Sequence, residues 1–236
     1  MSPPAAPPLI VIPDPRFIMG TDLFSPGNAP VPGLGSVENK SVPITESLAA
    51  AALEGGADAI QLRAKGLSGP ALVALGRRLA ALCRSRGALF FVNDDAAAAL
   101  ACGADGVHVG PGDSAPQEAR RLLGERGLVG VSVYTDDDLA AAEEAHAAYV
   151  AVGAIYPTRT KEIAVVGLAS LRRWRARTSL PIVAIGGIDA ANAAAAIGAG
   201  ADGVAVISAV CGAPDPAAAV RKLRVRVLEA LAARQP

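Results

Sequence analysis

The chain contains 236 residues and carries no formal net charge, because 22 Lys and Arg balance 22 Asp and Glu. A hydrophobic fraction of 52% excludes a disordered chain, and the lack of a basic excess argues against a nucleic-acid partner. Aromatic residues make up only 3%, too few for a surface that stacks bases. These figures predict a helix-rich folded protein of one large domain or two small ones.

The cysteines and the chain start point to a cytoplasmic protein. Cys83, Cys102 and Cys211 are odd in number and widely spaced, unlike a disulfide framework. The first residues lack the basic and apolar regions of a signal peptide. No apolar stretch reaches the ~20 residues that a membrane helix needs, so we expect no membrane partner.

The predicted elements begin with a proline-rich tail over 1–8, expected to be disordered, and a strand over 9–12. A long loop over 13–43, rich in proline and glycine, is interpreted as either a lid over the site or packing. Helices are then predicted over 45–54, 69–86, 95–101, 115–123, 136–146, 168–177, 190–199 and 215–233. They alternate with strands over 59–62, 89–92, 106–109, 129–132, 149–152, 182–185 and 203–207.

A weak internal repeat supports this alternation. The triplet Gly-Ala-Asp occurs at 56–58, 103–105 and 200–202, each time between an alanine-rich stretch and a short apolar run. The pattern indicates a helix stopped by glycine and a strand buried on both faces. Eight such units predict an α/β protein with a single (β/α)8 TIM barrel over 9–236. An open doubly wound sheet is the alternative, but no glycine-rich dinucleotide motif is present.

Polar residues interrupt the apolar pattern at the strand ends, where such barrels carry their active sites. Gln61, Arg63 and Lys65 alternate along the end of the second strand, so they share one face. Two cations and an amide there suit a phosphate ligand, and a solvated strand end is the simpler alternative.

Acidic residues follow the next two strands. Asn93 and Asp94 end the third strand, and Asp113 follows the fourth. Two carboxylates beside a basic cluster favour a Mg²⁺ site, since that ion combines carboxylates with waters and substrate phosphates. Each aspartate alone is also explained as a helix N-cap, with Asp95 and Ser114 as further candidates for the same role.

The remaining strand ends complete the rim of the barrel. Ser132 ends the fifth strand, and the hydroxyl- and cation-rich segment 158–161 follows the sixth. Gly186-Gly187 and Ile207-Ser208 follow the last two strands, where backbone N–H groups commonly bind phosphate. Two anion sites are therefore expected, for two phosphorylated substrates or one bisphosphate. His108 is interpreted as a satisfied core or rim residue.

Seven motifs, in order and spacing over about residues 45–225, resemble those of the thiamine phosphate synthase family. They are Gln61 to Lys65, Asn93-Asp94, Gly106 to Gly110 with Asp113, Gly130 to Ser132, Thr158 to Lys161, Ile185 to Ile188, and Val206 to Ser208. The resemblance implies a Mg²⁺-dependent transferase of thiamine biosynthesis. In that reaction hydroxymethylpyrimidine diphosphate loses pyrophosphate, and the nitrogen of hydroxyethylthiazole phosphate attacks the pyrimidine methylene.

The resemblance also implies residue roles. The pyrimidine diphosphate would be bound by Gln61, Arg63, Lys65, Asn93, Ser132 and Lys161, of which Arg63, Lys65, Ser132 and Lys161 would be catalytic. The thiazole phosphate would be bound by Thr158, Thr160, Gly187, Ile207 and Ser208, and Mg²⁺ by Asp94 and Asp113. Loss of pyrophosphate leaves a cationic methylene, so catalysis needs charge stabilisation and alignment rather than an acid–base group.

The chain departs from the family pattern in places. Tyr134 stands where His is usual, and Pro111 where Gln is common. A related thiazole tautomerase is one alternative, although it lacks the complete sets around Arg63 and Thr158. A non-catalytic phosphate-binding barrel is another. A homo-oligomer is compatible with the sequence, which does not determine the oligomeric state.

Overall fold

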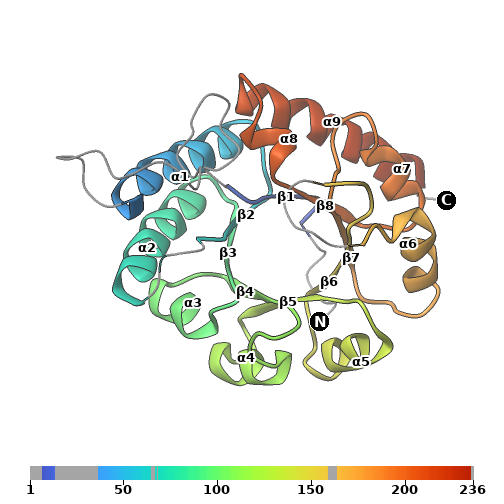
Figure 1. The fold of residues 1–236 in the computed structure, drawn as a ribbon, viewed down its shortest axis with the longest axis horizontal. Coiled ribbons are helices and arrows are strands. Elements are labelled where there is room, and N and C mark those ends of the chain that lie inside the picture. Colours follow the sequence, from blue (N-terminus) through green and yellow to red (C-terminus); the bar gives the residue numbers. More distant parts are fainter. Residues whose placement is uncertain (1–6, 14–36, 65–66, 68, 159–163, 235–236) are drawn as a thin grey trace.

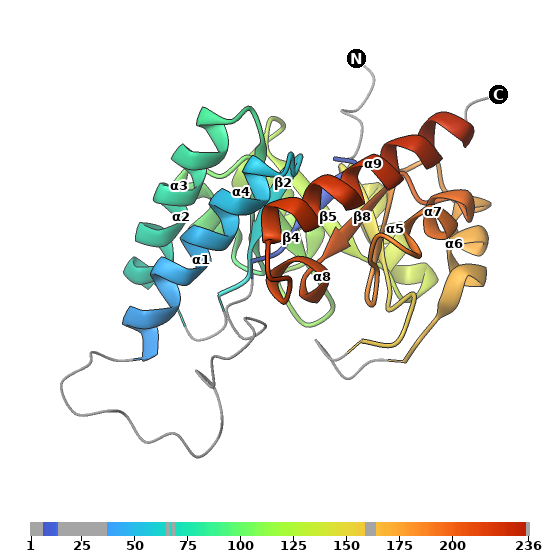
Figure 2. The ribbon, with the colours of Figure 1, turned by 90° about the horizontal axis from the view of Figure 1, so that it is seen from above.

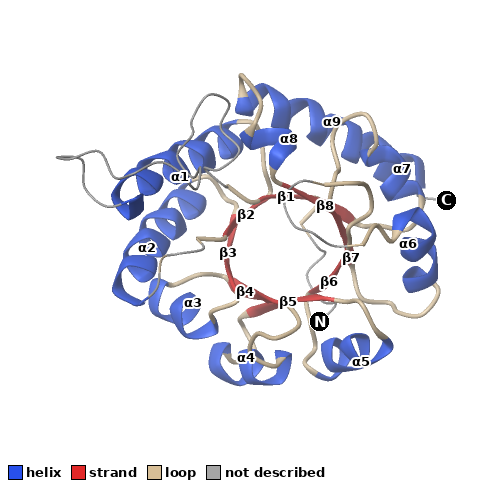
Figure 3. Cartoon of the chain, viewed as in Figure 1, coloured by secondary structure: helices blue, strands red, loops and turns tan. Residues whose placement is uncertain are grey.

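The computed structural model describes residues 7–13, 37–64, 67, 69–158 and 164–234. Within these ranges, parallel strands form a closed barrel in chain order, and β8 pairs with β1 (Figures 1 and 3). The predicted (β/α)8 barrel is thereby confirmed. The strands are β1 (Leu9–Val11), β2 (Ala59–Leu62), β3 (Leu89–Asn93), β4 (Gly106–Val109), β5 (Leu128–Ser132), β6 (Tyr149–Val152), β7 (Ile182–Ile185) and β8 (Gly203–Val206).

Helices surround the barrel and cover its outer face (Figure 1). They are α1 (Val37–Glu54), α2 (Gly69–Ser85), α3 (Ala96–Cys102), α4 (Pro116–Leu123), α5 (Asp136–Glu144), α6 (Gly167–Arg175), α7 (Ala193–Gly198) and α9 (Pro216–Arg234). A four-residue helix, α8 (Ser208–Cys211), lies between β8 and α9 (Figure 2). The sequence does not predict α8, because one turn carries too little hydrophobic periodicity. No helix of the described residues has the length and apolar character needed to cross a bilayer.

Alternate residues of the strands enter two separate apolar clusters, because a barrel strand is covered on both faces. One set, including Ile60 and Phe90, packs against the helices. The other set, including Ile10, Phe91 and Tyr149, fills the barrel interior. This alternation places the side chains at the strand ends either in the barrel mouth or under the helices.

The Gly-Ala-Asp repeat binds the amino-terminal ends of the strands together. The N–H of Asp105 donates to the Phe90 carbonyl at 2.9 Å, and its Oδ2 accepts from the Phe90 N–H at 2.8 Å. The other two copies make the same pair of bonds, Asp58 with Leu9 and Asp202 with Ile182. Each aspartate thus pairs with both the N–H and the carbonyl of a residue near the start of a strand. Leaving these buried backbone groups without hydrogen bonds would lower the stability of the fold.

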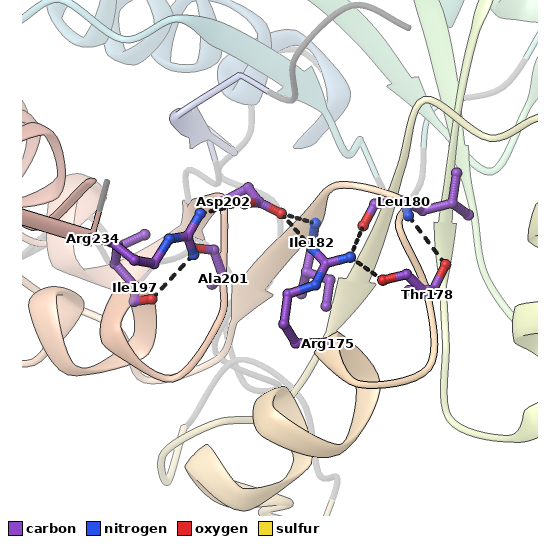
Figure 4. Close-up of polar contacts among 8 residues, drawn as sticks. All are labelled: Arg175, Thr178, Leu180, Ile182, Ile197, Ala201, Asp202 and Arg234. Atoms are coloured by element: carbon purple, nitrogen blue, oxygen red, sulfur yellow. Dashed lines mark hydrogen bonds and ion pairs between the residues drawn. The ribbon is translucent and has the colours of Figure 1, made fainter. Parts of the chain in front are cut away.

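Asp202 also joins two helices to the sheet (Figure 4). Arg175 of α6 lies 3.0 Å from its Oδ2, and Arg234 of α9 lies 2.5 Å from its Oδ1. Arg175 donates further to the carbonyls of Thr178 and Leu180. This cluster lies at the end of the barrel opposite the strand carboxyl ends, so we assign it to stability.

Two predicted boundaries need correction. Helix α1 begins at Val37 instead of residue 45 and continues through Pro43, so the predicted loop 13–43 is shorter than expected. Its remainder, 14–36, lies outside the described residues, as do 1–6 of the expected tail. Pro7 and Pro8 were expected in that disordered tail, but Pro7 is buried and the Pro8 carbonyl accepts from the Val204 N–H at 3.0 Å. Pairing with β8 therefore orders the end of the tail.

Candidate active site

A cavity of about 270 Å³ extends from the carboxyl ends of the strands into the barrel interior. All of the predicted site residues that the structure describes line it, namely Gln61, Arg63, Asn93, Asp94, Asp113, Ser132, Thr158, Gly187, Ile207 and Ser208. The other three, Lys65, Thr160 and Lys161, lie outside the described residues. The barrel therefore brings together side chains that the sequence spreads over about 150 positions.

Asp94 and Asp113 leave neighbouring strands at one side of this cavity. Pairing of β3 with β4 sets Asn93 opposite His108, and the Asp94 N–H donates to the His108 carbonyl at 2.7 Å. Asp94 has φ +70°, a left-handed conformation that is costly outside glycine and recurs at functional sites. Asp113 Oδ2 accepts from the Gly110 N–H at 2.8 Å, which holds the carboxylate at the end of β4.

Helix capping explains neither aspartate. Helix α3 is capped by Asp95, whose Oδ1 accepts from the Ala98 N–H at 2.7 Å. Helix α4 starts after Ala115 with no side-chain cap. Two carboxylates in one cavity wall fit Mg²⁺, which completes its shell with waters and phosphate oxygens. The described residues contain no group of three or more His, Cys, Asp and Glu able to hold a metal.

Arg63 brings a positive charge to the same cavity. Its side chain is half-buried in the wall just after β2. None of the hydrogen bonds or ion pairs within the described part of the chain involves it. A partly desolvated guanidinium with no internal counter-ion favours binding of an anion, and its planar donors match phosphate oxygens.

A buried chain of polar side chains crosses the barrel interior at the cavity. His108 Nε2 lies 2.9 Å from Ser132 Oγ, and His108 Nδ1 lies 3.1 Å from the Tyr149 hydroxyl. The Tyr149 ring stacks on the imidazole, with centroids 5.6 Å apart. The Gln61 side chain lies near enough to the Tyr149 hydroxyl to influence the pKa of that group. Gln61, Tyr149, His108 and Ser132, here called the polar chain, come from β2, β6, β4 and β5.

Burial sets the charge state of the polar chain. It lowers the pKa of His108 to about 4, because an imidazolium loses its hydration there, and Asp113 opposes this only in part. Burial raises the pKa of the Tyr149 hydroxyl, and the nearby Gln61 side chain opposes that rise. Both groups are therefore neutral near pH 7, and each holds a single hydrogen-bonding proton.

Glycines and backbone N–H groups form the other side of the cavity. Gly187 has φ +65°, and a Cβ at this position would lie 2.5 Å from the Pro157 carbonyl oxygen. The positive φ and the nearby Pro157 carbonyl each require glycine at position 187. The sequence alone indicates a different reason, the close approach of a ligand. Helix α8 follows with Ile207 as its N-cap, and its first bonds are donated by Val210 and Cys211. The preceding Ser208 N–H has no intrahelical acceptor.

The comparisons with known proteins agree with this geometry. A family model described as thiamine monophosphate synthase matches residues 38–210. The chain belongs to this family. The predicted family, and with it the thiamine-phosphate synthase activity of a transferase, is thereby confirmed.

Individual relatives of the family cover most of the chain. A thiamine-phosphate synthase of Moorella thermoacetica is 50% identical over 188 residues, 79% of this chain and 90% of that protein. One from Methanoregula boonei is 49% identical over 181 residues, 76% of this chain and 84% of that protein. The structure of a thiamine phosphate pyrophosphorylase from Pyrococcus furiosus matches with a TM-score of 0.76 and 36% identity, covering 94% of this chain and 96% of that one.

Several residues that line the cavity have no functional role predicted from the sequence. His108 is buried, as predicted for a core residue, but it also lines the cavity and contacts Ser132. Tyr149 receives no predicted role, although it is the polar member of the strand sequence Tyr-Val-Ala-Val. Tyr134 and Pro111, the two departures from the family pattern, both line the cavity, and Tyr134 is 41% exposed there.

Proposed function

We propose that this protein couples hydroxymethylpyrimidine diphosphate to hydroxyethylthiazole phosphate, using Mg²⁺ and acting in the cytoplasm. The products are thiamine phosphate and pyrophosphate. The proposal is carried by a cavity lined by Arg63, which forms no ion pair within the described residues, by the carboxylates of Asp94 and Asp113, and by a glycine-rich backbone wall. Two anion-binding regions in one cavity suit two phosphorylated substrates.

The pyrimidine diphosphate is assigned to the side formed by β2, β3 and β5. Arg63 would bind diphosphate oxygens, and Gln61, Asn93 and Ser132 would orient the substrate from the neighbouring strands. Lys65 and Lys161 are assigned to the same substrate on their motifs alone. Asp94 and Asp113 would hold Mg²⁺, which when bound neutralises charge on the diphosphate and on the leaving pyrophosphate.

The thiazole phosphate is assigned to the side formed by the ends of β6, β7 and β8. Thr158 would contribute its hydroxyl, and Thr160 is assigned by its motif. Gly187, Ile207 and Ser208 would contribute backbone groups at the start of α8, the usual phosphate position in such barrels.

Charge stabilisation and alignment account for the chemistry in this arrangement. As the bond to pyrophosphate breaks, Arg63 would stabilise the developing negative charge, while the two sites hold the thiazole nitrogen in line with the methylene carbon. His108 is neutral near pH 7 with both ring nitrogens hydrogen-bonded, so it is not assigned as a general acid that transfers a proton to substrate.

Turnover by the purified protein tests the proposal. With Mg²⁺ and both substrates, we expect thiamine phosphate and pyrophosphate in equal amounts. Arg63→Gln should lower kcat by at least ~10²-fold, as for loss of one transition-state charge contact. Arg77→Gln is the matched control, because this exposed arginine hydrogen-bonds to the Ala101 carbonyl and does not line the cavity. Binding of both substrates without product would instead favour the non-catalytic phosphate-binding barrel.

The metal assignment has its own test. Asp113→Asn removes a charge but keeps an oxygen that can accept from the Gly110 N–H. The Mg²⁺ concentration for half-maximal turnover should therefore rise about tenfold or more, while stability stays close to that of the unmodified protein. An unchanged Mg²⁺ titration would reduce Asp113 to a residue that shapes its loop. Replacing the thiazole by its carboxylated form in the same assay determines which substrate is preferred.

A further inference from the structure

The polar chain is buried, so its hydrogen bonds depend on one another. Gln61, His108 and Tyr149 are 4%, 8% and 1% exposed, so water cannot easily replace a lost partner. Gln61 and Ser132 are also the residues that the proposed function assigns to the pyrimidine diphosphate. They stand on either side of the barrel interior, and Tyr149 and His108 lie between them, with hydrogen bonds that connect Tyr149 to Ser132 through His108.

Counting protons shows that the hydrogen bonds of the polar chain must run in one common direction. The Ser132 hydroxyl, the Tyr149 hydroxyl and the neutral His108 ring each hold one hydrogen-bonding proton. If Ser132 donates to a ligand, His108 Nε2 must carry the ring proton and donate to Ser132. His108 Nδ1 then accepts from the Tyr149 hydroxyl.

The ligand chemistry selects between this direction and its reverse. A diphosphate has only acceptor oxygens near neutral pH, so Ser132 must donate to it. The reverse direction would turn the Ser132 proton towards His108 and present lone pairs to the diphosphate, which is repulsive.

We propose that Tyr149 is a positioning residue for this reaction, whose hydroxyl acts through His108 to fix Ser132 as a donor towards the pyrimidine diphosphate. Neither Tyr149 nor its hydroxyl needs to contact the reacting atoms. The proposal rests on the proposed function for the identity of that ligand.

Tyr149→Phe removes the hydroxyl and keeps the ring that stacks on His108 and packs edge-on against Phe91. We expect kcat/KM for the pyrimidine diphosphate to fall about tenfold, the scale of one orienting hydrogen bond. The KM for the thiazole phosphate should stay within about twofold, because Tyr149 lies at the start of β6, whereas that substrate is assigned to groups beyond the carboxyl ends of β6, β7 and β8. Tyr156→Phe is the matched control, since its hydroxyl donates only to the Asn192 carbonyl.

A double-mutant cycle separates positioning from a general packing effect. If Tyr149 acts through His108 on Ser132, then Tyr149→Phe should have much less effect in a Ser132→Ala background than in the unmodified protein. Equal losses in both backgrounds would overturn the proposal. So would an unchanged kcat/KM, or a parallel loss of affinity for the thiazole phosphate.

Nitrogen NMR of the histidines gives a readout that does not depend on turnover. The chain has two histidines, so His108 can be assigned by comparison with a His146→Gln variant. With Mg²⁺ and inorganic pyrophosphate, His108 should be the Nε2–H tautomer in the unmodified protein and a mixture of tautomers in Tyr149→Phe. An Nδ1–H tautomer in the unmodified protein would overturn the proposal. Absence of turnover with the expected tautomer would count against the proposed function alone.

Discussion

One buried side chain, His108, should make this protein less stable in acid. Its pKa is about 4 in the folded state because burial disfavours the imidazolium, against an ordinary value of 6.5. The unfolded chain therefore binds a proton in the interval between these values and the folded chain does not. Stability falls as the pH drops from about 6.5 to about 4, and above this window His108 has no effect on the pH dependence.

The magnitude follows from the two pKa values. The interval from 6.5 to about 4, at 1.36 kcal/mol per pKa unit, corresponds to about 3 kcal/mol when fully developed. At pH 5 about 2 kcal/mol should already be lost. For a domain with a free energy of unfolding of ~5–15 kcal/mol, such a loss is a large share of the total.

Urea unfolding at pH 7.5, 6 and 5 measures this effect. The unmodified protein is compared with His108→Gln, which removes the titrating ring, and with His146→Gln, which removes an exposed one. The difference in unfolding free energy between the unmodified protein and His108→Gln should shrink by about 2 kcal/mol between pH 7.5 and pH 5. Contributions from other titrating groups cancel in this difference. A difference that stays constant with pH would refute a buried, neutral His108.

Substitutions at three further positions test the packing around the barrel. Asp202→Ala should lower the free energy of unfolding by about 2–3 kcal/mol in urea titrations, because the Ile182 N–H and two arginines lose their acceptor, and Asp202→Asn should recover part of this loss. Gly130→Ala would put a methyl group 2.3 Å from the Tyr149 ring, so it should cost about 1–3 kcal/mol and lower turnover with it. A Cβ added at Gly198, in helix α7, would meet open space. Gly198→Ala should therefore raise the free energy of unfolding by about 0.5–1 kcal/mol, seen as a higher melting temperature.

The barrel and the composition of its mouth follow from local features of the sequence. Apolar runs of four or five residues predict strands, and chain order alone then places Gln61, Asp94 and Ser132 at one end of the sheet. Period-2 alternation puts Gln61 and Arg63 on the inner face, as the structure confirms. These predictions succeed because they require only neighbouring residues and the parallel order of the strands.

Helix boundaries and the roles of single residues depend on longer-range contacts. The sequence pattern cannot show that α1 continues through Pro43, nor that the Gly-Ala-Asp aspartates bind the preceding strand across 15 to 49 positions. It also allows Asp94 and Asp113 to be read as helix caps. Only the observed bonds of Asp95 and Gly110 exclude that interpretation.

The sequence by itself therefore determines the closed barrel, the polar residues at its mouth and the family to which they belong. The tertiary structure decides which of these side chains act together. His108 and Tyr149 look like core residues because they occupy inward positions of apolar strands, yet closure of the barrel joins them to Ser132 and Gln61. The physical reason is that a hydrogen bond depends on distances between strands, and one strand's residues carry no information about what faces them across the barrel.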